Sequence, residues 1–157
     1  MKIKQVTTEK EKSASDRLLW NVLWKPLNLP RHIRDSFKLD TPQIELIAIE
    51  GKVIAGALVA NWLSENEIEI RHLAVGLDYQ ENSIGTMLVK ELLELVREKA
   101  PLRIQTHARN TSIGFFSKLG FKPSGSRLDQ QNFMKQGLWI QQMSADLVPN
   151  NSKQLSS

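Results

Sequence analysis

A β-rich run followed directly by an amphipathic helical pattern constrains the fold of this chain more than any other feature. Residues 67–75 are β-rich and end in the sequence IRHLAV. After a short turn, apolar residues recur at helical spacing, at Ile84, Met87, Leu88, Leu92, Leu95 and Val96. The pattern ends before Ala100-Pro101, since the residue before a proline disfavours helical backbone. This strand–turn–helix unit is typical of an α/β fold.

Further strands are predicted on both sides of this unit. Their ranges are 1–7, 43–49, 52–62, 102–108 and 138–147. The second and third flank Glu50-Gly51, which predicts a hairpin with glycine at positive φ.

Two more helices are predicted. The first carries Leu18, Leu19, Val22 and Leu23 on one face, and we expect Ser13 or Ser15 to cap it and Pro26 to end it. The second covers 110–119 and stops at Gly120-Phe121. The stretch 25–40 is expected to be a loop with one helical turn.

Strands and helices alternate in the middle of the chain and strands pair as hairpins at both ends, so a mixed α/β sheet is predicted. A chain of 157 residues, 41% of them hydrophobic, suits one domain with a sizeable core. We therefore expect a single domain over 1–148 and a disordered polar tail over 149–157.

The composition excludes several classes of protein. The chain has no cysteine, which excludes disulfide frameworks, thiolate zinc sites and cysteine nucleophiles. Its net charge is +4, but the basic residues are scattered and form no stripe of the kind that binds nucleic acid. No stretch approaches the roughly 18 apolar residues of a membrane span, and the N-terminus lacks the apolar run of a signal peptide. We expect a cytoplasmic protein without nucleic-acid or membrane partners.

The turn before the long helix is a candidate anion site. A helix N-terminus exposes unpaired backbone N–H groups and the positive end of the helix dipole. Residues 80–85, QENSIG, follow a strand and open a helix, which allows a phosphate to bind there. The turn has only one glycine, so Ser83 as an ordinary N-cap is at least as good an interpretation.

Two ordered motifs narrow the interpretation. The first comprises Leu73, Val75, Tyr79, Gln80, Ile84 and Gly85. The second comprises Asn110, Phe115, Phe116, Lys118, Gly120 and Phe121. Together they resemble the cofactor motif and a second motif of the GNAT superfamily of N-acetyltransferases, except that Ser83 replaces the usual first glycine and Leu77 a common proline. Two ordered motifs at the right separation are more specific than either alone.

The resemblance implies an α/β (α+β) fold with a mixed, mostly antiparallel twisted sheet flanked by helices. Its splayed central parallel strands would hold acetyl-coenzyme A (acetyl-CoA). Backbone N–H groups from about Glu81 to Gly85, with Asn82, Ser83 and Ile84 between them, would hold the pyrophosphate. The pantetheine arm would pair with the backbone of Leu73, Ala74 and Val75, and Gln80 and Thr86 would also belong to the cofactor site. Serine still serves at position 83 if its φ is negative, because the contact uses an N–H group.

The resemblance also implies catalytic roles. Glu69 stands where several family members carry their base, although a strand glutamate beside an arginine is also an ordinary ion pair. The N–H of Val75, freed by the bulge this family shows, would meet the oxyanion. Phe116 fills a cofactor-contacting position where many members have a tyrosine acid, and phenylalanine donates no proton. Water or Ser117 would then protonate the leaving thiolate. Asn110 resembles the family's cofactor-contacting asparagine and is equally an ordinary N-cap.

The histidines suggest no metal site. His72 shares a strand face with isoleucines, which favours a packed, hydrogen-bonded core position, whereas His107 could approach either His72 or the acceptor. A site built from His32, His72 and His107 has no recognisable ligand spacing, so no metal is expected.

A basic stretch occupies the place where the family builds its acceptor pocket. Arg31, Arg34 and Lys38 would there recognise an acidic acceptor, but solvated surface charge is the commoner explanation for such residues.

These observations predict an N-acetyltransferase that moves an acetyl group from acetyl-CoA to a primary amine by direct attack in a ternary complex. The acceptor would be a small molecule or a protein amino group, and the sequence allows a homodimer. The alternative is an acetyl-CoA-binding sensor or interaction module with weak or no catalysis, motivated by Ser83 and Phe116.

Overall fold

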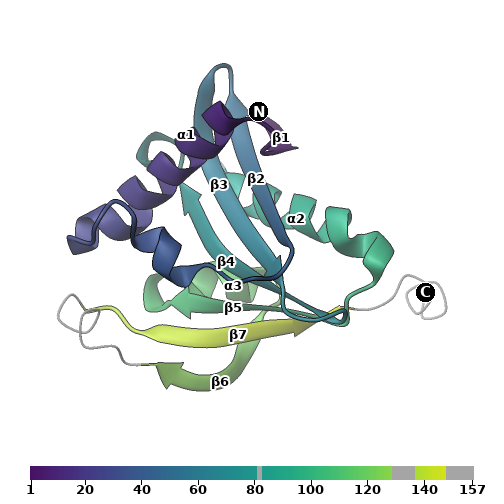
Figure 1. The fold of residues 1–157 in the computed structure, drawn as a ribbon. Helices are drawn as coiled ribbons and strands as arrows, with labels where there is room; N and C mark the ends of the chain where they lie inside the picture. Colours follow the sequence, from purple (N-terminus) through teal and green to yellow (C-terminus); the bar gives the residue numbers. More distant parts are fainter. Residues whose placement is uncertain (81–82, 129–136, 148–157) are drawn as a thin grey trace. The chain divides into compact units, whose positions relative to one another are not determined.

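The computed structural model describes residues 1–80, 83–128 and 137–147, so the predicted disorder of the tail falls outside the described residues. Figure 1 shows the strands: β1 (Lys2–Gln5), β2 (Gln43–Glu50), β3 (Val53–Trp62), β4 (Glu67–Val75), β5 (Arg103–Arg109), β6 (Lys122–Leu128) and β7 (Ile140–Asp146). The α-helices are α1 (Glu9–Leu19), α2 (Ile84–Val96) and α3 (Ile113–Lys118).

The strands hydrogen-bond in the order β1-β2-β3-β4-β5-β7-β6. Antiparallel pairs join β1 to β2, β2 to β3, β5 to β7 and β6 to β7, whereas β4 and β5 are parallel, with Glu69 opposite Gln105. The predicted fold class, a mixed and mostly antiparallel α/β sheet flanked by helices, is therefore confirmed.

The chain divides into two compact units. Unit 1 comprises Met1–Asn61 and Arg71–Leu95, and unit 2 comprises Trp62–Ile70 and Val96–Ser157. β4 passes from unit 2 into unit 1 after Ile70, so its two halves carry different parts of the predicted site.

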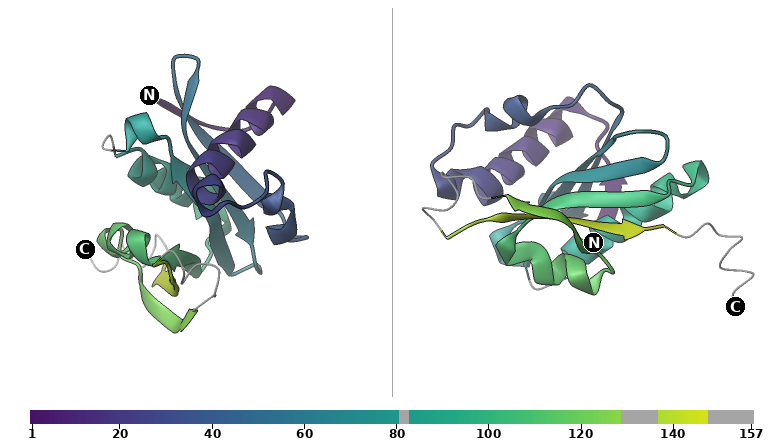
Figure 2. Two further views of the ribbon diagram at one scale, coloured as in Figure 1. Left: turned by 90° about the vertical axis from the view of Figure 1, so that its left-hand side faces the viewer. Right: turned by 90° about the horizontal axis from the view of Figure 1, so that it is seen from below.

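In unit 1, helices α1 and α2 cover opposite faces of the strands. Leu19 of α1 packs in a buried cluster with Ala57 of β3, on the side where α1 crosses the strands in Figure 2. On the other face, a Cβ at Gly56 would lie 2.9 Å from the side chain of Ile84 in α2. Gly56 and Ala57 are neighbours on one strand, so their side-chain directions point to opposite faces.

Helix α1 begins earlier than the sequence interpretation placed it. Thr8 is its N-cap: the Thr8 hydroxyl accepts the Glu11 N–H at 3.1 Å, and the Glu11 carboxylate accepts the Thr8 N–H at 3.2 Å. This reciprocal pair is a capping box, and the Thr-x-x-Glu spacing that encodes it was overlooked. The prediction of Ser13 or Ser15 as the cap was wrong, because Ser15 is buried and donates its hydroxyl hydrogen to Glu45 at 2.7 Å.

After α1 the helical path continues in other forms. A π-helical turn spans Trp20–Trp24, and 3-10 turns span Lys25–Leu27 and Ile33–Phe37. The predicted loop over 25–40 therefore holds two short turns where one was expected.

In unit 2, α3 contacts β5, and strand β6 was not predicted. β6 is exposed along its whole length and contains Pro123 and Gly125, so it carries no apolar alternation. It pairs with β7, where the Gln141 side-chain amide donates to the Gly125 carbonyl at 2.9 Å. The strand is thus specified by its partner and not by its own composition.

Two predicted turn glycines are confirmed. Gly51, between β2 and β3, has φ +62°, and Gly120, after α3, has φ +97°. Both values lie in the left-handed region that glycine adopts without a steric penalty. Within the described part of the chain, no helix is both long and apolar enough to cross a membrane.

Candidate functional site

Hydrogen bonds hold the turn between β4 and α2 in unit 1. The Gly76 N–H donates to the Ala55 carbonyl of β3 at 2.7 Å, and the Tyr79 N–H donates to the Gly76 carbonyl at 2.9 Å. The Gln80 side-chain amide donates to the Val75 carbonyl at 3.1 Å. Two predicted site residues, Val75 and Gln80, therefore meet at the end of β4.

The register of β3 and β4 requires an extra residue on β4. Near their connection, the Leu63 N–H donates to the Glu67 carbonyl at 2.9 Å, and at the other end Gly76 bonds to Ala55. The path from Glu67 to Gly76 is one residue longer than the path from Ala55 to Leu63. One extra residue in one of two antiparallel strands makes a β-bulge, which agrees with the bulge implied by the family resemblance.

Ser83 has left-handed backbone just before α2, with φ +59°. The condition of a negative φ, under which serine was expected to serve in place of glycine, is therefore not met. The backbone takes a conformation that glycine adopts freely and that costs other residues roughly 1–2 kcal/mol. The Ser83 carbonyl accepts the N–H of Met87 at 3.1 Å, and its side chain is exposed. The turn therefore has the left-handed backbone conformation that glycine favours, and the serine side chain at this position is exposed to solvent.

Gly56 sets how closely α2 approaches the strands of unit 1. A methyl group there would lie 2.9 Å from the Ile84 side chain, 3.1 Å from the Leu88 side chain and 3.3 Å from the Ala74 carbonyl oxygen. These separations are shorter than ordinary van der Waals contacts of about 3.5–4.0 Å. The first turn of α2 is therefore seated against β3 and β4 with no room for a side chain between them.

The position of the first turn of α2 is suited to binding a phosphate group. The first four N–H groups of a helix lack intrahelical acceptors, and the helix dipole favours an anion there. Gly85 is buried and Thr86 half-buried, so backbone rather than long side chains forms the start of α2. Glu81 and Asn82, which were predicted to belong to this site, lie outside the described residues.

The end of β4 combines buried and accessible positions. Ala74 is 3% exposed and belongs to the core of unit 1, whereas Leu73 and Val75 are half-buried. In unit 1 the structure therefore gathers the β4 end, Gln80 and the start of α2, which are most of the predicted cofactor-binding residues.

Glu69 lies in unit 2, and residues of β5 hold its carboxylate. Its side chain is 3% exposed, and Gln105 donates from Nε2 to Glu69 Oε2 at 2.7 Å. Gln142 of β7 donates in turn to Gln105 Oε1 at 3.2 Å. His107 Nδ1 lies 3.5 Å from Glu69 Oε2, and the His107 side chain is 40% exposed. A buried carboxylate is thus connected to the surface of unit 2 through a histidine.

Asn110 and Phe116 also lie in unit 2. The Asn110 side chain donates to the Gly137 carbonyl at 3.2 Å and accepts the Trp139 N–H at 3.1 Å. It does not cap α3, whose N-cap is Ser112. Phe116 is 5% exposed and packs edge-on against Phe115 and Phe121, with ring centroids 5.0 and 5.2 Å away. Neither residue offers the proton that a tyrosine would.

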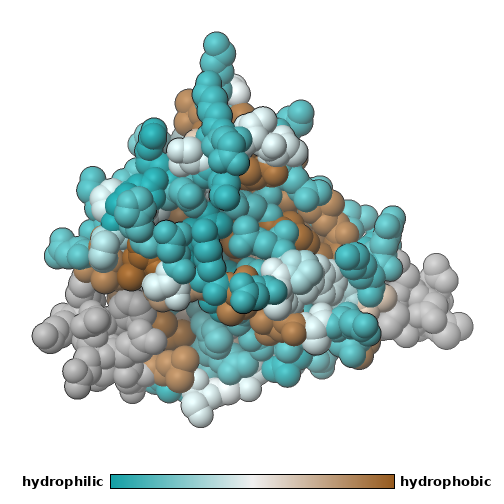
Figure 3. All heavy atoms as spheres, in the orientation of Figure 1, coloured by the Kyte–Doolittle hydropathy of each residue, from teal (hydrophilic) through white to brown (hydrophobic). Residues whose placement is uncertain are grey.

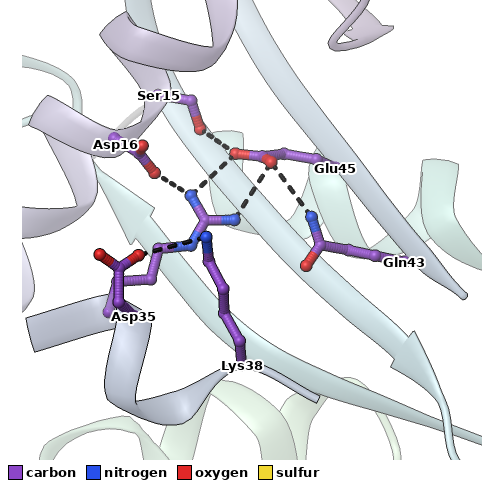
Figure 4. Close-up of polar contacts among 7 residues, drawn as sticks. Ser15, Asp16, Asp35, Lys38, Gln43 and Glu45 are labelled. Carbon is purple, nitrogen blue, oxygen red and sulfur yellow. Dashed lines mark hydrogen bonds and ion pairs between the residues drawn. The ribbon is translucent and has the colours of Figure 1, made fainter. Parts of the chain in front are cut away.

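Arg34 is a buried ion-pair centre in unit 1. Its guanidinium bonds to Glu45 at 3.1 and 3.2 Å and to Asp16. Figure 4 shows that Ser15 and Gln43 both hydrogen-bond to the Glu45 carboxylate. Burial lowers the pKa of Arg34, but the hydrogen bonds and charges of Glu45 and Asp16 outweigh it and raise the pKa above its usual value. The group is therefore permanently charged.

The prediction that Arg34 is a solvated charge or an acceptor-recognition group was wrong. Its side chain is 8% exposed and fully engaged, since it links α1, the Ile33–Phe37 turn and β2. The other two basic residues of this stretch make surface contacts: Lys38 pairs with Asp35 at 3.2 Å, and Arg31 lies over the Trp20 ring at 5.8 Å.

The histidines are separated by environment. His72 is half-buried and packs against Trp24 and Phe37, with ring centroids 5.0 and 6.2 Å away, so its predicted packed position is confirmed. His107, by contrast, lies beside Glu69. Among residues 1–80, 83–128 and 137–147, no group of three or more His, Cys, Asp or Glu side chains could hold a metal ion.

Two polar residues of β5, Gln105 and Arg109, were not predicted as site residues. Gln105 was read only as part of a strand, yet the parallel pairing of β4 with β5 places it opposite Glu69. The alternation of Arg103, Gln105 and His107 along β5 was the available signal. Arg109, at the end of β5, was also missed; it is half-buried, and burial lowers its pKa.

The sequence of this chain matches a family model. The model is described as the acetyltransferase (GNAT) family, and it matches residues 10–121. A candidate [ribosomal protein bS18]-alanine N-acetyltransferase of Bacillus subtilis (strain 168) is 26% identical over 100 residues. That match covers 60% of this chain and 66% of the relative, so the chain spans just under two thirds of that relative's length.

Solved structures share the fold. A crystal structure of an aminoglycoside 6'-N-acetyltransferase complexed with coenzyme A has a TM-score of 0.77 at 18% identity, over 96% of this chain and 99% of that chain. The ribosomal-protein-S18-alanine N-acetyltransferase of Escherichia coli has a TM-score of 0.76 at 15% identity, over 96% of this chain and 97% of that chain. At these identities the similarity establishes the fold alone.

Proposed function

The chain belongs to the acetyltransferase (GNAT) family, and we propose that it moves an acetyl group from acetyl-CoA to a primary amine by direct attack in a ternary complex. One observation carries the proposal: the buried Glu69 carboxylate is held by Gln105 and reaches the surface of unit 2 through His107. This arrangement can take a proton from an amine and release it to solvent.

The residues that would hold acetyl-CoA lie at the end of β4 and around the start of α2. Backbone N–H groups from Ser83 to Thr86 would bind the pyrophosphate, and the backbone of Leu73 to Val75 would bind the pantetheine arm. When bound, acetyl-CoA supplies a thioester whose acetyl group is the one transferred. The hydroxyl of Ser83 is exposed and can donate to a phosphate oxygen.

Glu69 is proposed as the base. An alkyl amine of pKa about 10.4 is almost fully protonated at neutral pH, so a proton must leave before it becomes a nucleophile. Gln105 donates to Oε2 of Glu69 and so fixes the orientation of the carboxylate. His107, 3.5 Å from that oxygen and partly exposed, offers the outward route for the proton.

Val75 and Phe116 complete the proposal. The Val75 N–H, on the bulged strand, would donate to the acetyl carbonyl oxygen as negative charge develops there. Phe116 donates no proton, so the thiolate would leave unaided or take its proton from water or Ser117. A thiol of pKa about 8.5 leaves tolerably well, so turnover is expected to be slower but not abolished.

A protein amino group is the proposed acceptor. The curated relative is named for an alanine amino group of a ribosomal protein, and so is one of the solved structures. Another solved structure is named for an aminoglycoside, so a small amine is the second candidate.

The test has two stages. Acetyl-CoA at about 100 times its Kd should raise the free energy of unfolding by about 2.7 kcal/mol, measured as a rise in Tm. Thiol release should then depend on an amine drawn from a panel of alanine-terminated peptides, lysine peptides and small polyamines. A Tm rise without release from any amine would favour the alternative, a sensor module. No Tm rise would reject acetyl-CoA as the cosubstrate.

A further inference from the structure

None of the residues assigned above to catalysis lines a groove in unit 1, whose lining includes Gly76 and Leu77 just after Val75. Its volume is about 1,020 Å³, and α1, the β2–β3 hairpin and the start of the β4–α2 turn enclose it. The lining residues that matter here are Leu18, Val22, Ile49 and Ile54 on the floor and Lys10, Arg17, Lys25 and Lys52 on the rim. This volume is at the upper end of the roughly 300–1,000 Å³ of ligand pockets.

The floor is aliphatic. All four floor side chains are half-buried, so each presents part of its surface to the groove. Leu77, which also lines the groove, is 81% exposed. Exposed apolar surface of this kind, bordered by polar residues, is typical of an interaction site.

The rim is strongly basic. All four rim cations are exposed, and Glu11, the one carboxylate among the described lining residues, is already bound by Lys4 at 2.5 Å. Among the described residues, Lys10, Arg17 and Lys52 make no ion pair. Lys25 lies over the Trp20 ring at 5.6 Å. Figure 3 shows mainly hydrophilic surface over the hairpin end of unit 1, with hydrophobic surface beneath it.

We propose that this groove binds an extended acidic segment of another protein, with an aliphatic side chain anchored on the floor and carboxylates paired to the rim. The basic rim favours an anionic partner, because opposite charges attract. The aliphatic floor favours an acidic protein segment, because such a segment can also supply an aliphatic side chain. Single-stranded nucleic acid is bound by aromatic rings that stack on its bases, and none of the described residues that line the groove is aromatic. A bilayer is also disfavoured, because a concave surface cannot press its apolar floor into a flat lipid layer.

The experiment measures binding by fluorescence anisotropy on the full chain. The probe is a short fluorescein-labelled peptide of glutamates with two central leucines. Comparison probes carry lysines for the glutamates or serines for the leucines. A single-stranded oligouridylate and phosphatidylserine vesicles report the other two partner classes. Each titration is repeated with saturating coenzyme A.

The test variant is Lys10→Glu with Lys52→Glu, and the matched control is Lys90→Glu with Lys118→Glu, which makes the same charge change at exposed sites outside the groove. The test variant should weaken the acidic peptide about tenfold, and the control less than twofold. Replacing the leucines or introducing Leu77→Ser should also weaken binding. All variants should keep the wild-type Tm.

Four outcomes would overturn the proposal. The first is that the acidic peptide does not bind. The second is that both double variants weaken its binding equally, which would mean that net charge alone drives binding. The oligouridylate or the vesicles bind in its place and respond to the test variant. Coenzyme A displaces the peptide completely, which would make the groove part of the cofactor site. Because coenzyme A binding is measured separately by Tm, failure of the groove leaves the proposed acetyl transfer untouched.

Discussion

Two buried glutamates, one in each unit, are held in opposite ways. The side chain of Glu45 in unit 1 is 8% exposed, and that of Glu69 in unit 2 is 3% exposed. Glu45 accepts two hydrogen bonds from the Arg34 guanidinium, whereas Glu69 accepts one from the Gln105 amide and has His107 beside it.

The two carboxylates differ more in the side chains that bind them than in their burial. A guanidinium stays protonated, so protonating Glu45 would leave a buried cation without its counter-charge. The Gln105 amide that donates to Glu69 carries no charge, and His107 beside it is a side chain whose charge can change. Burial alone would not have told the two carboxylates apart.

Glu69→Gln should have the largest effect on activity. The substitution keeps the shape but removes the proton acceptor, so we expect kcat/KM to fall by about 10²- to 10⁴-fold at neutral pH. The measurement is thiol release with the best amine of the panel. The matched control, Glu45→Gln, should keep kcat per folded molecule within about twofold. Equal rates for Glu69→Gln and wild type across pH would remove Glu69 from the mechanism.

Arg34→Met should have the largest effect on stability. It leaves Glu45 and Asp16 without their cation, and breaking a buried pair from one side costs about 3–5 kcal/mol. Denaturant unfolding measures the change directly. Arg34→Met combined with Glu45→Leu should recover part of the loss, because no buried carboxylate is then left facing the gap. If the double variant is as unstable as the single one, shape and not charge explains the cluster.

His107→Gln should have a smaller effect on activity than Glu69→Gln. The base remains, but its outward proton route is lost, so we expect kcat/KM to fall about tenfold. Added imidazole should restore part of the rate by carrying the proton in place of the side chain. A loss that imidazole does not relieve, or a change in KM alone, would assign His107 to packing or acceptor binding.

Glu11 is a half-buried carboxylate for comparison with Glu45 and Glu69, and its substitution should have the smallest effect. The hydrogen bond from Lys4 and those from the Thr7 and Thr8 backbone lower the pKa of Glu11 from 4.5 to about 2. A pKa lowered by folding stabilises the protein above pH 4.5, and this contribution disappears as the pH falls towards 2. Glu11→Gln should therefore flatten the fall of Tm over this range. An unchanged slope would mean that the capping box does not titrate with folding.

Periodicity made most of the fold predictable. The β4 range was predicted to the residue, and α2 was found from its apolar spacing. β6 was missed because an exposed strand needs no apolar pattern of its own, and its pairing with β7 is a long-range property. The N-cap Thr8 differs from β6 in this respect, because the Thr-x-x-Glu spacing of its capping box is a local signal that the sequence contains.

The site was predictable where backbone alone defines it. The β4–α2 turn could be located from the order of a strand, a turn and a helix, but the backbone angle of Ser83 could not be read from its side chain. Partners were harder to foresee. Arg34 and Glu45 are 11 positions apart on different elements, and no local periodicity predicts that their side chains meet.

Gly56 fixes how closely the start of α2 approaches β3, and this closeness limits which residues can evolve at position 56. Ser83 shows that the turn tolerates a side chain, because that side chain points to the surface. Position 56 has no such tolerance, since even a methyl group would collide with Ile84. The freedom to vary the turn therefore depends on a residue of β3 outside it, and selection on the helix start should act on both positions together.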